Sequence, residues 1–176
     1  PVAHQVRSDL VGLPDELTTL AEVLSARTYV TAGFPNDIDV ARSYNFHQGF
    51  DYFDYQAPAA LYGATESASR LRLYRLIRQV WVERSPARVE NHYQPAEVVL
   101  GAARQFIAAN QQRRWFVWVH LMEPHEPYFS HQGGSVRLEP PGQSGPHRAR
   151  YTGEVGWLDQ QLSELLRWMR TEGLME

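Results

Sequence analysis

The side chains best suited to chemistry gather in one short segment of this chain. His120, Glu123 and His125 lie close together, between an apolar run and a Pro-rich stretch. An imidazole titrates near neutral pH, so a histidine at this place can give a proton to a leaving group or take one from a nucleophile. Two imidazoles and a carboxylate also suit zinc, although Pro124 restricts their geometry. The non-catalytic alternative is a surface turn whose histidines bond to backbone carbonyls.

The residues on either side indicate how this segment is positioned. Trp115–Val119 is an unbroken run of β-forming apolar residues, which predicts a strand covered on both faces. Pro124 and Pro127 prevent regular backbone hydrogen bonding after it. The candidate residues should therefore lie just past the carboxyl end of a buried strand, which is where ligands bind in open α/β sheets.

The other elements follow from capping, periodicity and turn signals. Thr19 and Glu22 have the spacing of a capping box at the start of a helix. A second buried strand is predicted at Thr28–Phe34. Further helices are predicted at Leu71–Glu83, Pro95–Asn110 and Thr152–Glu172, and a mobile Gly/Pro-rich loop at Gly133–Arg150. Asp37 and Asp51 are interpreted as turn formers, Asp51 with substrate contact as an alternative, and Glu154 and Asp159 as residues that cap or brace the last helix.

This order of elements predicts an α/β fold, part of a doubly wound sheet with helices on both faces. Two strands alone make a poor sheet, so we expect residues 1–176 to form one internal segment of a larger domain. Unpaired central strands also favour association, which makes a homo-oligomer a weaker alternative.

Composition excludes several function classes. The 176 residues carry a net charge of -3, which gives no electrostatic case for binding nucleic acid or an anionic membrane. No apolar run is long enough for a membrane span. The chain has no Cys, and all 17 of its basic residues are Arg, so neither thiolate nor lysine chemistry can come from these residues. The Arg residues in the predicted helix at 71–83 are interpreted as a solvated helix face.

Five segments, in chain order, resemble motifs of the sulfatase family of the alkaline phosphatase superfamily. The most specific is His120–Tyr128, which resembles the family's "H-x-x-D-P-H-x-P-Y". The others are a "LP…TLAE-L" helix at Leu13–Leu24, a "GY-T-A" strand at Tyr29–Ala32, a "GFD" turn at Gly49–Asp51, and a "Y-x-x-E-V-x-x-x-D…LL" helix at Tyr151–Leu166.

The resemblance implies an alkaline-phosphatase-like fold and assigns roles to the candidate residues. His125 matches the family's active-site histidine and is the predicted catalytic residue. Apart from the resemblance, His120 and Glu123 are predicted to bind substrate, with the alternative for His120 of a buried, hydrogen-bonded residue that orients the loop. The family's nucleophile motif, C/S-x-P-S-R, and the ligands of its divalent cation (Ca or Mg/Mn) are expected outside this chain. None of the metal ligands is assigned to residues of this chain.

The predicted function is accordingly that of an internal part of a metal-dependent ester hydrolase, inactive alone, with a small-molecule ester as its substrate. The segment that begins at Gly33 stands where many sulfatases have "GKWHLG", and it lacks that Lys and His. Phosphate and phosphonate esters therefore remain alternatives to sulfate esters. A non-catalytic scaffold or partner-binding remnant of the same fold is the alternative function.

Overall fold

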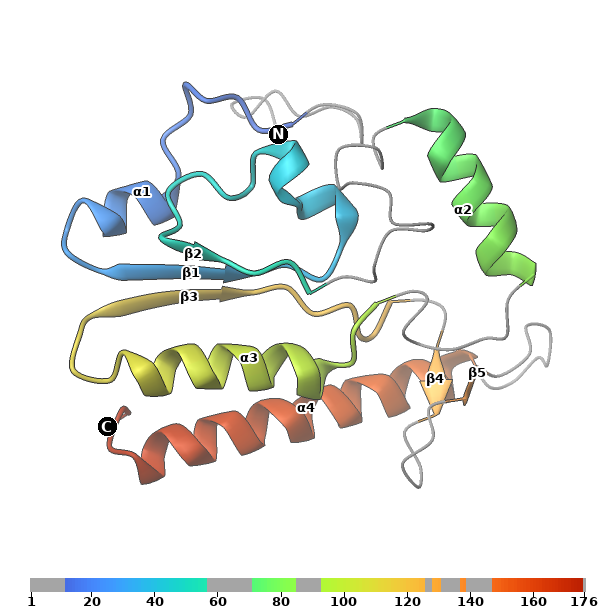
Figure 1. Cartoon of the computed structure of the whole chain (residues 1–176). Helices are drawn as coiled ribbons and strands as arrows, with labels where there is room; N and C mark the ends of the chain where they lie inside the picture. The colour runs from blue at the N-terminus through green and yellow to red at the C-terminus, as the bar shows by residue number, and fades with distance from the viewer. Residues whose placement is uncertain are drawn as a thin grey trace.

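A three-stranded parallel sheet forms the centre of the protein. The computed structural model describes residues 12–56, 71–84, 93–125, 128–130, 137–138 and 147–175. In the sheet, β1 (Val30–Phe34) lies between β2 (Tyr52–Phe53) and β3 (Trp115–Val119) (Figure 1). The α/β prediction is confirmed. The third strand was not predicted, because two residues are too few to show a strand pattern in sequence.

The register of β1 on β3 explains the shape of the core. Val30 pairs with Trp115 and Phe34 with Val119, so the two apolar runs align along their whole length. On one face, α3 (Ala96–Ala109) packs against the sheet through a cluster of small and aromatic residues, Ala32, Phe34, Val99 and Ala103. β1 is fully buried. β3 is covered on both faces, on the α3 side through Val117 and Val119 and on the other side by Phe50, but its residues are only half-buried because β3 is the edge strand of the described sheet.

Aromatic side chains cover the opposite face of the sheet. The ring of Phe50 stacks on Phe116 and on Trp118, with ring centroids 6.0 Å apart in both pairs. Phe53 lies over Gly33, where an added Cβ would come within 2.7 Å of the Phe53 ring. Gly33 therefore allows the Phe53 side chain of β2 to pack directly on the backbone of β1.

A hydrogen-bonded corner holds this aromatic segment in place. Gly49 has φ +82°, and a Cβ there would lie 2.4 Å from the backbone nitrogen of Glu22. The Asp51 carboxylate accepts hydrogen bonds from the backbone N–H of Thr31 (2.9 Å) and from its hydroxyl (3.1 Å). Asp51 thus joins the turn to the buried strand β1, which is a structural role for this residue.

The helices largely match the sequence predictions. The capping box of Thr19 and Glu22 is present at α1 (Leu20–Ser25), α2 spans Arg72–Arg84, and Gly173 (φ +69°) ends α4. α4 (His147–Thr171) lies along α3 and begins earlier than predicted (Figure 1). The apolar spacing of the last helix predicts that Val155, Leu162 and Met169 face inward; Met169 is buried, while Val155 and Leu162 are exposed.

Short elements complete the described structure. Two 3-10 helices, η1 (Ile38–Val40) and η2 (Arg42–Tyr44), connect β1 to the aromatic corner. The antiparallel pair β4 (Phe129–Ser130) and β5 (Arg137–Leu138) extends into the predicted mobile loop, most of whose residues lie outside the described ranges. Within the described part of the chain, no helix is long and apolar enough to cross a membrane.

Candidate functional site

The segments that follow β1 and β3 meet at one edge of the sheet. Because the two strands are parallel neighbours, their carboxyl ends lie side by side. The backbone N–H of His120 donates to the carbonyl of Phe34 at 3.1 Å, which continues the pairing one residue past the end of β3. This edge carries the predicted site residues, as the sequence indicated.

His120 is half-buried at this edge. Its ring lies beside Trp118, with centroids 6.1 Å apart, and within the described residues its buried Nδ1 has no hydrogen-bond partner. Burial lowers the pKa of His120 below its ordinary value, and the nearby Asp37 carboxylate opposes that shift. The imidazole is consequently favoured in its neutral form, able to act as an uncharged hydrogen-bonding group.

Glu123 points into the protein. It is only 2% exposed, and its Oε1 accepts a hydrogen bond of 2.8 Å from the backbone N–H of Ala96, the first residue of α3. The N-cap of this helix is Pro95, which has no side-chain cap bond of its own. Glu123 therefore supplies a cap from a distant segment, and its negative charge suits the positive end of the helix dipole. The predicted contact of Glu123 with substrate stays a prediction.

A second long-range contact holds the same stretch before α3. Asn36 is fully buried, and its side-chain amide donates to the carbonyl of Gln94 at 2.7 Å while its Oδ1 accepts the Gln94 N–H at 2.8 Å. The segments after β1 and after β3 are thus both bonded to residues 94–96. Asn36 is turn-prone by residue type, and nothing local in the sequence shows that it pairs with a backbone so far along the chain.

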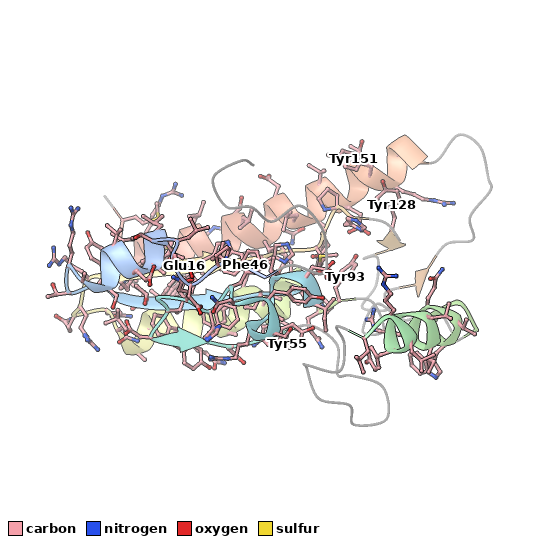
Figure 2. The ribbon with its side chains drawn as sticks, turned by 90° about the horizontal axis from the view of Figure 1, so that it is seen from above. Glu16, Phe46, Tyr55, Tyr93, Tyr128 and Tyr151 are labelled. Atoms are coloured by element: carbon pink, nitrogen blue, oxygen red, sulfur yellow. The ribbon has the colours of Figure 1, made fainter. Side chains whose placement is uncertain are left out.

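The last helix also reaches this region. Glu154, in the first half of α4, is 1% exposed. Burial raises the pKa of the Tyr93 hydroxyl, and the negative charges of Glu154 and then Glu123 raise it further. Figure 2 shows Tyr128 close to Tyr151 of α4, and their rings meet edge to face at 6.3 Å. Glu154 lies inside α4, so it does not cap the helix; its buried position near Tyr93 is compatible with the other predicted role, that of bracing the helix.

His125 differs from its neighbours because its side chain is exposed. Its backbone N–H donates to the carbonyl of Met122 at 2.6 Å, which closes a turn that contains the cis peptide bond between Glu123 and Pro124. Glu123, two residues before His125, is hydrogen-bonded to the first residue of α3, so the turn holds the exposed imidazole in a defined position. This is the arrangement that a proton donor to a bound substrate needs.

The described residues do not fit a metal centre. No three His, Asp or Glu side chains in the described part of the chain lie close enough together to hold a metal ion. Since Glu123 bonds to α3, the alternative zinc site of His120, Glu123 and His125 is not supported. We assign no step of a reaction to a metal held by these residues.

Comparison with known proteins agrees with the motifs found in sequence. A search of curated proteins gives no match for this chain. The family model described as Sulfatase matches residues 2–176, nearly the whole length. The matched region contains both strands of the candidate edge, the His120–Tyr128 segment and the α4 residues that pack against it. The chain therefore belongs to the sulfatase family.

Proposed function

We propose that this chain is part of a hydrolase of sulfate, phosphate or phosphonate esters, with His125 as the acid that protonates the leaving group. Members of the family hydrolyse small-molecule esters and generally depend on a metal ion. The observation that carries the proposal is the exposed imidazole of His125 at the carboxyl edge of a parallel sheet.

The proposed reaction requires only one proton transfer from these residues. A nucleophile attacks the sulfur or phosphorus atom, and the bond from that atom to the ester oxygen breaks. The departing oxygen gains negative charge as the bond lengthens, and a proton moves to it from the imidazolium of His125. The neutral imidazole then takes a proton from solvent. We propose that the nucleophile and a divalent cation (Ca or Mg/Mn) are held by residues outside the described ranges.

His120 and Glu123 serve this site in different ways in the proposal. In the neutral tautomer that carries its proton on Nε2, the imidazole of His120 donates a hydrogen bond to substrate through that atom and leaves the buried Nδ1 unprotonated. The buried bond of Glu123 to α3 favours a positioning role, in which Glu123 fixes the turn that carries His125. A direct contact of Glu123 with substrate would require that bond to open.

The test compares leaving groups of different basicity. The variants are made in the smallest protein that contains this chain and shows turnover. There, His125→Ala should lower kcat by about 10²–10⁴-fold on an alkyl ester, which is the usual contribution of a general acid. The loss should be much smaller on a 4-nitrophenyl ester, because 4-nitrophenolate leaves without protonation. Sulfate, phosphate and phenylphosphonate esters of both alcohols identify the ester class.

Two results would contradict the proposal. An equal loss of kcat on both leaving groups would mean that His125 acts through structure and not by proton transfer. Absence of turnover on all three ester classes, with Ca²⁺, Mg²⁺ or Mn²⁺ present and with the flanking coding sequence included, would favour the non-catalytic scaffold.

A further inference from the structure

Helix α2 turns an apolar face towards solvent. At 100° per residue, five of its apolar residues fall on one side of the helix. All five are exposed, by 37–68% of their surface: Leu73, Leu76, Ile77, Val80 and Trp81. A helix of a water-soluble domain normally buries such a face, so this one is suited to contact something outside the described chain.

The same helix is strongly cationic. Its sequence contains four Arg and a single Glu, a local charge of +3 (4 − 1) in a chain whose total charge is -3. The helical positions of Arg75 and Arg78 lie opposite the apolar side, the exposed Arg72 lies at its border next to Leu76, and the position of Arg84, in the last turn, falls within it. The overall charge of the chain therefore conceals a basic amphipathic helix, which sequence analysis had interpreted as an ordinary solvated face.

The location of α2 relates this face to the candidate site. Figure 1 and Figure 2 both show α2 beyond the end of the sheet at which β1 and β3 finish. The edge that carries His120 and His125 faces the same end of the molecule. A surface bound by α2 would thus lie on the side from which an ester substrate reaches the sheet edge.

We infer that α2 binds an anionic lipid surface, with its apolar face in the headgroup region and its Arg residues among the lipid phosphates. An exposed apolar side of Leu, Ile, Val and Trp, with Arg residues opposite it, at its border and at the end of the helix, is the composition of helices that lie in a membrane interface. Trp81 also belongs to the residue type that prefers the interface itself. A second copy of the chain fits less well, because pairing the apolar sides of two such helices would bring together the positive charges of Arg72 and Arg84, whose helical positions lie at or within that side.

This inference does not depend on the proposed catalytic function, and vesicle binding tests it directly. The whole chain is mixed with vesicles of phosphatidylcholine alone or with added phosphatidylglycerol, and bound protein is separated by sedimentation. We expect binding to the anionic vesicles only, and its loss at high salt. Arg72→Gln should weaken partitioning about fivefold, the value of one Arg near an anionic surface. Val80→Glu should abolish it.

A matched control distinguishes the α2 face from exposed apolar residues in general. Leu20 is 61% exposed on α1, and Leu20→Glu makes the same kind of change away from α2. Binding should survive in this variant, and circular dichroism should show both variants folded. The inference fails if the folded chain does not bind anionic vesicles at low salt, or if Leu20→Glu reduces binding as much as Val80→Glu. It also fails if Val80→Glu instead abolishes a dimer, which would identify a second copy as the occupant.

Discussion

Replacing Glu123 by alanine would remove the contact that joins the site segment to helix α3. The Glu123 carboxylate accepts the N–H of Ala96 at 2.8 Å and is 2% exposed, so the alanine variant leaves a buried donor without its acceptor. Pro95, at the N-cap, cannot replace the bond because its side chain has no acceptor. Losing a hydrogen bond to a charged group together with a helix cap should cost about 2–3 kcal/mol of unfolding free energy.

Thermal and urea unfolding measure this cost. For a domain of this size the melting temperature should fall by about 4–12 °C, at about 2–4 °C for each kcal/mol. Glu123→Gln retains an acceptor oxygen and should lose less. Glu97→Ala is the control, because Glu97 is an exposed acidic residue in the first turn of the same helix, where charge alone contributes under about 1 kcal/mol.

The same variant tests whether Glu123 positions His125. Amide hydrogen exchange across residues 120–125 should become faster in Glu123→Ala and stay unchanged in Glu97→Ala. If the stability of Glu123→Ala equals that of Glu97→Ala, the buried bond contributes nothing and the reasoning is refuted. If stability falls while exchange in this segment is unchanged, Glu123 only stabilises α3 and does not position His125.

Two further predictions concern the corner before β2 and the buried histidine. Gly49→Ala should lower the free energy of unfolding, measured in urea, by about 2–4 kcal/mol, because Gly49 has a positive φ and an added Cβ would meet Glu22. Gly101→Ala, at an open position in the middle of α3, should leave this free energy unchanged or raise it. Burial lowers the pKa of His120 in the folded chain. As the pH falls through about 6.5, the imidazole therefore becomes protonated in the unfolded chain at a higher pH than in the folded chain, which favours unfolding. Stability should therefore decrease below that pH, and His120→Phe should flatten the decrease when urea unfolding is followed against pH.

Each of these two predictions has a contradicting result. Equal stability of the Gly49→Ala and Gly101→Ala variants would mean that the corner adjusts to a side chain at no cost. A pH dependence that is the same with and without His120 would assign the loss of stability to other groups.

Local sequence patterns predicted much of the fold. The capping box of Thr19 and Glu22, the apolar runs at β1 and β3, and the start of α3 after Pro95 all depend on neighbours within a few residues. Such signals are visible in sequence because helix capping and strand burial use short-range periodicity. β2 lacked such a signal because two residues are too few to show a strand pattern; in the structure they pair with β1, where Gly33 leaves room for the Phe53 ring.

The sequence by itself determined the α/β class, the family and the position of His120, Glu123 and His125 after a buried strand. Only the tertiary structure decided how each of these residues is used. Glu123 bonds to a helix 27 residues away, and Asn36 bonds to a backbone 58 residues away. A polar side chain is stable in the core only when such a partner is present. Whether a carboxylate faces substrate or the interior therefore depends on contacts that residue order alone does not show.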